Sequence, residues 1–124
     1  MKITIRFASY KVEAELYDTP TAKAIYNSLP IHENISQWGD EIYFEIPLEI
    51  PLEPDARPAV SVGDLAYWPN MPAFCIFFGP TPVSSGKTPV AASSVNIFGK
   101  LTKVEPDLLR KIAETSKVTV TKNE

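Results

Sequence analysis

Hydrophobic and polar residues alternate with a period of two at the start of the chain. Ile3, Ile5 and Phe7 are separated by polar residues, which predicts a strand with one buried face. A second alternating stretch over residues 11–16 follows a short turn, and we expect it to pair antiparallel with the first. The chain is therefore predicted to begin with a β-hairpin.

Two segments have helical spacing instead. Thr19 can cap a helix that begins with Pro20 at its first position, and apolar residues follow at helical spacing as far as Leu29. Pro30 helps to end this helix. A second helix is predicted from Pro106 onward, because an acidic residue in its first turn precedes an apolar stripe.

The remainder of the chain is predicted to be mostly strand. Alternation or short apolar runs predict strands over residues 40–46, 64–68, 73–78, 95–101 and 118–120. The proline-rich segment 47–58 is expected to be an extended connection, because proline lacks the N–H that a sheet interior needs. These elements favour one mainly β domain over residues 1–124, folded as a closed antiparallel β-barrel with two short helices.

The distribution of charge narrows the choice of partners. The net charge is −3, but segment 31–70 alone carries −7, because eight acidic residues stand against Arg57. Such a segment repels phosphate backbones, so we expect no nucleic-acid partner, and we interpret the acids as the outer face of a sheet. No apolar run reaches the ~18 residues of a membrane span, and the N-terminus resembles a strand more than a signal peptide. We expect a cytoplasmic protein without a membrane partner.

Few side chains suggest metal or nucleophile chemistry. Cys75 stands in an apolar run, where a thiol behaves as a small hydrophobe, and His32 is expected to be a partly exposed strand residue. With one cysteine and one histidine, we expect no metal and no cofactor. Asp40 and Glu41 are adjacent, so on a strand they would point to opposite faces, and we interpret them as a turn acid and a surface acid.

Aromatic residues gather in the central strands. The run 73–78 is apolar on both faces, so its outer face must be covered by another segment or must line a binding groove. In one interpretation these rings are core packing. In the other, Gln37, Tyr43, Trp68 and Phe74 form a pocket for an extended peptide, a proline ring or a small apolar ligand.

The order of the predicted elements resembles that of a cyclophilin. Segment 37–40 is similar to the cyclophilin sequence Gln-Gly-Gly-Asp, and segment 97–101 resembles its Val-Phe-Gly-Lys-Val strand. Segments 38–44, 63–69 and 77–82 resemble a family of small prokaryotic cyclophilin-like proteins of uncertain function. The resemblance covers nearly the whole chain and implies a cyclophilin-like barrel.

Cyclophilins use an arginine to lower the ~20 kcal/mol barrier to rotation about Xaa-Pro bonds. The resemblance places that position near Leu29, and it places the cyclophilin histidine near Val95, so both groups are missing here. Gln37 matches the pocket glutamine, and Phe74 or a neighbour matches the phenylalanine of the proline pocket. The resemblance therefore implies a non-catalytic or weakly active module that binds a peptide or small ligand. The alternatives are an atypical peptidyl-prolyl isomerase and an assembly protein.

Overall fold

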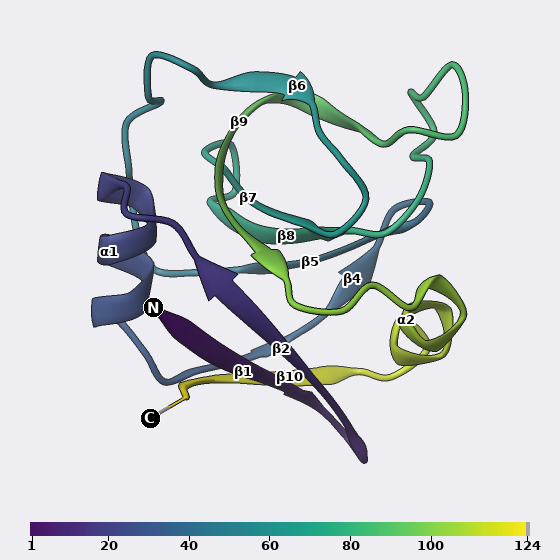
Figure 1. The fold of residues 1–124 in the computed structure, drawn as a ribbon, viewed down its shortest axis with the longest axis horizontal. Helices are drawn as coiled ribbons and strands as arrows, with labels where there is room; N and C mark the ends of the chain where they lie inside the picture. Colours follow the sequence, from purple (N-terminus) through teal and green to yellow (C-terminus); the bar gives the residue numbers. More distant parts are fainter. Residues whose placement is uncertain (124) are drawn as a thin grey trace.

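The computed structural model describes residues 1–123, which form ten strands and two helices (Figure 1). The strands are β1 (Lys2–Phe7), β2 (Tyr10–Leu16), β3 (Ile31–Asn34), β4 (Ser36–Gln37), β5 (Glu41–Glu45), β6 (Arg57–Ala59), β7 (Asp64–Trp68), β8 (Ala73–Phe77), β9 (Val90–Leu101) and β10 (Lys117–Lys122). The helices are α1 (Pro20–Asn27) and α2 (Pro106–Ile112).

The strands form one curved sheet in which all pairings are antiparallel, as predicted. Its order is β3-β10-β1-β2-β9-β7-β8-β5-β4, and β6 pairs with β9 beside this path. The expected closed barrel is not confirmed, because no hydrogen-bonded pairing in residues 1–123 joins the end strands β3 and β4. These two strands are separated by Ile35 alone, and antiparallel partners need a connection of about two residues or more.

Both helices begin where the sequence predicts. The hydroxyl of Thr19 accepts a hydrogen bond from the backbone N–H of Ala22 at 3.1 Å, and Pro20 occupies the first helical position. Pro106 likewise occupies the first position of α2, although the residue before it, Glu105, makes no side-chain capping hydrogen bond. Neither of these helices has the length and apolar character needed to cross a membrane.

Strand β8 is buried on both faces along its whole length. On one face Phe74 belongs to the main core, where its ring stacks on Phe44 with centroids 4.7 Å apart and meets the edge of Phe98 at 5.0 Å. On the other face Cys75 and Phe77 belong to a second, smaller apolar cluster. The double burial explains why segment 73–78 has no polar positions.

Strand β9 provides the cover for this second face. Its last residues pair with β2 and β7 in the main sheet, whereas its first residues pair with β6. Figure 1 shows β9 bending away from the sheet toward β6. We call its first residues, which pair with β6, the bent part of β9. Ala91 and Val95 from the bent part join the second cluster. The strand is longer than the predicted 95–101, because small and polar residues at its start give no apolar alternation.

A buried polar network fixes the connection between β5 and β6. The side chain of Asn96 accepts a hydrogen bond from the Glu53 N–H at 2.8 Å and donates to Thr21 Oγ1 at 2.9 Å and to the Pro51 carbonyl at 3.1 Å. Thr21 in turn donates from its hydroxyl to the Glu53 carboxylate. Within residues 1–123 the connection contains no strand, and β6 begins directly after it at Arg57.

Removing the amide of Asn96 should therefore destabilise the protein. Asn96→Ala leaves several buried donors and acceptors without partners, so we expect the free energy of unfolding to fall by about 2–3 kcal/mol. Thr102→Val, which removes one exposed side-chain hydrogen bond to Glu13, should cost less than about 1 kcal/mol. Urea denaturation of both variants tests this, and an equal cost for the two would contradict the role given to the network.

Candidate functional site

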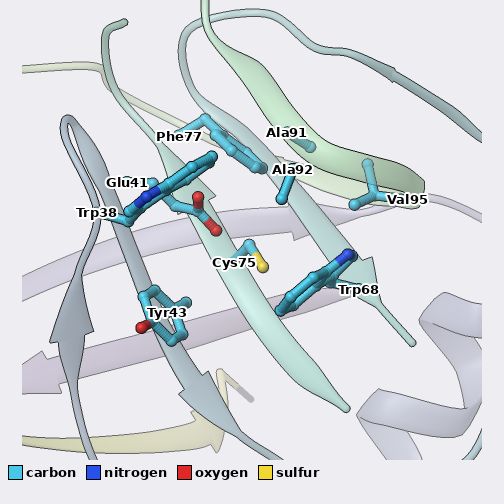
Figure 2. Close-up of a pocket in the computed structure, with 9 residues that line it drawn as sticks. All are labelled: Trp38, Glu41, Tyr43, Trp68, Cys75, Phe77, Ala91, Ala92 and Val95. Carbon is cyan, nitrogen blue, oxygen red and sulfur yellow. The ribbon is translucent and has the colours of Figure 1, made fainter. Parts of the chain in front are cut away.

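A cavity of about 280 Å³ opens on the second face of β8 (Figure 2). Its lining is mostly apolar and aromatic, and contains no lysine, arginine or histidine. The lining residues are Trp38, Glu41, Tyr43, Trp68, Cys75, Phe77, Ala91, Ala92 and Val95. A concave, apolar site with very few polar groups is typical of small-molecule binding.

The floor of the cavity follows from the register of β5 and β8. Glu41 lies opposite Phe77, and Tyr43 lies opposite Cys75. Side chains two residues apart on a strand share a face, so these four point to the side of the sheet away from the main core. Figure 2 shows the Glu41 carboxyl and the Cys75 thiol between the rings of Trp38 and Trp68.

Trp38 is held by a tight turn between β4 and β5. The backbone N–H of Trp38 donates to the Glu41 carbonyl at 2.9 Å, and the backbone N–H of Glu41 donates to the Trp38 carbonyl at 3.1 Å. Gly39 in this turn has a φ of +59°, and a Cβ there would lie 2.9 Å from the Cα of Thr81. Asp40 lies in the turn, as predicted, and pairs with Arg110 at 3.2 Å. The position of Trp38 is therefore set by backbone geometry.

Trp68 ends β7 on the opposite side of the cavity. Its indole N–H donates to Ser93 Oγ at 2.7 Å, which ties the ring to the bent part of β9. The ring is half-buried, as are Trp38 and Tyr43. The aromatic walls are thus partly open to solvent and available to a ligand.

Glu41 is the one carboxyl in the lining, and only 6% of it is exposed. Burial raises its pKa from 4.5 to about 7, and a hydrogen bond with the Cys75 thiol offsets part of this rise. The interpretation of Glu41 as a surface acid is wrong. Period-two alternation places Glu41 and Ile42 on opposite faces of β5. The face with Glu41 is covered by the bent part of β9 and not by water.

Cys75 faces the same cavity but is a poor nucleophile. Its complete burial raises the pKa of the thiol well above its usual value, and the neighbouring Glu41 raises it further. The thiolate is the reactive form of cysteine, so this residue contributes packing and a weak hydrogen bond. Its behaviour agrees with the small hydrophobe expected from the sequence.

The structure brings together two of the four residues proposed for the pocket. Tyr43 and Trp68 line the cavity, whereas Gln37 and Phe74 do not. Gln37 is exposed on β4 and donates to the Gly39 carbonyl at 3.0 Å. Phe74 is fully buried in the main core, because it lies directly opposite Phe44 and therefore shares its face. Phe74 is therefore a core residue and not a residue of the pocket.

The sequence contained a partial signal for the residues that were missed. Glu41 and Tyr43 are two apart on an alternating strand, so a pocket that includes Tyr43 also predicts Glu41. The same spacing connects Cys75 with Phe77. By contrast, Ala91, Ala92 and Val95 enter the lining only through the bend of β9, which no local pattern indicates.

Comparison with known proteins identifies the family. A family model described as Cyclophilin-like matches residues 1–121, so the chain belongs to the cyclophilin-like family. A hypothetical protein from Archaeoglobus fulgidus, known from a solution structure, is 37% identical and superposes with a TM-score of 0.82. That match covers 99% of this chain and 95% of the archaeal protein. No curated protein matches the sequence.

A second solved structure shares the fold at much lower identity. It is that of McbB in complex with tryptophan, with a TM-score of 0.73 at 14% identity. The match covers 98% of this chain but only 44% of McbB, so this chain spans less than half of that protein. At this identity the likeness shows a common fold alone.

The correction of Phe74 has a measurable consequence. Phe74→Ala removes a fully buried ring that packs on two others, so we expect a loss of about 3–5 kcal/mol in the free energy of unfolding. Tyr43→Ala truncates a half-buried ring at the cavity and should cost clearly less. Chemical denaturation of both variants tests the assignment. It would be contradicted if Tyr43→Ala proved the more damaging change.

The buried carboxyl makes stability depend on pH. The pKa of Glu41 is about 7 in the folded chain and near 4.5 when unfolded, so the folded state holds more protons between these values. The free energy of unfolding should therefore be highest below about pH 5 with respect to this group. It should fall by on the order of 3 kcal/mol as the pH rises to about 8.

Two variants isolate the contribution of this carboxyl. Glu41→Gln cannot ionise, so it should be more stable than the natural chain at about pH 8, and its free energy of unfolding should fall less between about pH 5 and pH 8. Glu45→Gln, at an exposed position of the same strand, should keep the dependence. The measurement is urea denaturation across the pH range, and an unchanged pH profile in Glu41→Gln would disprove the assignment.

Proposed function

We propose that this member of the cyclophilin-like family is a binding module that holds a small, largely apolar ligand in the cavity on the second face of β8. The observation that carries this proposal is the combination of half-buried aromatic walls with a single buried carboxyl in one concave site. Apolar surface supplies the affinity of such a site, and the polar group fixes the orientation of the ligand.

The size of the cavity favours a small molecule over a length of peptide. An apolar cavity of ~150 Å³ is enough to hold benzene, so about 280 Å³ suits a ring with a short substituent. A peptide could place one side chain there at most. McbB, which shares the fold, is known in complex with tryptophan, a small molecule with an apolar ring.

Peptidyl-prolyl isomerisation is the alternative, and it has less support. Catalysis of that kind needs a donor that strengthens its hydrogen bond to the prolyl nitrogen as resonance is lost. The cavity lining contains no arginine. Arg57 lies on β6, is exposed, and donates to the Asp55 carbonyl at 3.4 Å. Pocket binding and desolvation alone would give at most a modest rate enhancement.

The proposal is tested by filling the cavity. A library of small aromatic and aliphatic compounds should shift the amide NMR signals of β5 and β8 in the natural chain. Ala92 lines the cavity at an exposed position, so Ala92→Leu should fill it without unfolding the protein and should abolish these shifts. Lys100→Leu, an exposed position on the same strand, is the matched control and should bind normally. Shifts that survive Ala92→Leu would place the binding elsewhere.

The same spectrometer separates the two candidate functions. Exchange spectroscopy of Xaa-Pro peptides reports isomerisation directly, and we expect rates equal to those without protein. Accelerated exchange that is lost in Ala92→Leu would favour the isomerase instead. If neither compounds nor peptides produce any shift, the binding proposal fails.

A further inference from the structure

The only carboxyl in the cavity lining faces no positively charged side chain of that lining. Glu41 is almost fully buried, and the other lining residues are apolar or aromatic apart from the Cys75 thiol and the Tyr43 hydroxyl. An ionised carboxylate in such surroundings is costly unless it is paired with a cation. The cavity therefore contains a buried carboxyl whose ionised form has no cationic partner in the lining, and a ligand could supply that partner.

The charged groups on the neighbouring elements do not supply a cationic partner for Glu41. In the turn before Glu41, Asp40 is paired with Arg110 of α2 at 3.2 Å. Strand β8 contributes Cys75 and Phe77 to the lining, and the bent part of β9 contributes two alanines and Val95, so neither strand supplies a cation. Arg57 of β6 is exposed and lies outside the lining. The surrounding segment 31–70 carries a net charge of −7, which also favours a cation.

The aromatic walls of the cavity also favour a cation. The face of an indole or phenol ring carries partial negative charge and attracts a cation that lies over it. Trp38, Tyr43 and Trp68 surround the space into which the Glu41 carboxyl points (Figure 2). Rings and carboxylate together complement a positive charge that is attached to an apolar body.

We infer that the ligand of this cavity is a small organic ammonium, a protonated amine attached to a ring or short hydrocarbon, with its charge against Glu41. This inference rests on the proposed binding function and gives the chemical class of the ligand. The apolar body would lie between Trp38 and Trp68. The ammonium would donate hydrogen bonds to the carboxylate, an arrangement that is strong in a site of low polarity.

Three probes with one phenyl ring and different charge test this inference. They are phenethylamine, 2-phenylethanol and phenylacetate, a cation, a neutral molecule and an anion. Both tryptophans of the chain line the cavity, so tryptophan fluorescence reports on this site directly. At about pH 8 we expect the amine to bind about tenfold more tightly than the alcohol, a difference of ~1.4 kcal/mol, and the anion to bind least.

Matched variants assign the preference to one carboxyl. In Glu41→Gln the amine and the alcohol should bind alike, whereas in Glu45→Gln the preference for the amine should remain. If the amine and the alcohol bind the natural chain equally well, or if the anion binds best, the ammonium inference is overturned and the binding module stands. If no probe binds and the compound library also gives no shifts, both proposals fail.

The pH dependence gives a second test without any substitution. The amine stays protonated at neutral pH, as a lysine does. Below about pH 7 it must displace the proton that Glu41 holds in the empty cavity, so its affinity should fall by up to about tenfold for each further pH unit. The affinity of the alcohol should not fall in this way. Parallel pH profiles for amine and alcohol would overturn the inference.

Discussion

The structure depends on the burial of β8 on both faces. A strand of a sheet usually buries one face, but here Phe74 and Ile76 pack in the main core while Cys75 and Phe77 need a second cover. The bent part of β9 provides this cover through Ala91 and Val95. This cover is incomplete, and the space that it leaves is the cavity. The buried position of Glu41 follows from the same constraint, because its strand pairs directly with β8.

The sequence predicted the local elements better than it predicted their surroundings. The helix starts could be predicted because their signals are local. Thr19 caps α1 with a hydrogen bond, and Pro20 and Pro106 fix the backbone angle at the first position of each helix. Period-two alternation likewise assigned Glu41 and Ile42 to opposite faces. It could not show that the face of β5 with Glu41 is covered, because the cover comes from the distant β9. The assignment of Phe74 failed for the related reason that a strand apolar on both faces does not reveal which residues face the core.

The family likeness and the site chemistry answer different questions. The Cyclophilin-like match and the archaeal structure determine the fold, while the function must be argued from the cavity itself. Here the lining offers rings and one carboxyl where an isomerase needs a guanidinium donor. The proposed ligand site therefore combines a carboxyl with apolar surface, and the bend of β9 and the turn at Trp38 position its walls.

Glu41 is a buried carboxyl without a cationic partner in the cavity lining. Carbon-detected NMR titration of the glutamate side-chain carboxyls, with Glu41→Gln to assign the signal, measures this most directly. We expect a midpoint near 7 for Glu41. A midpoint near the ordinary 4.5 would mean that the carboxyl is solvated or already paired, and would disprove its role as a buried, unpaired group.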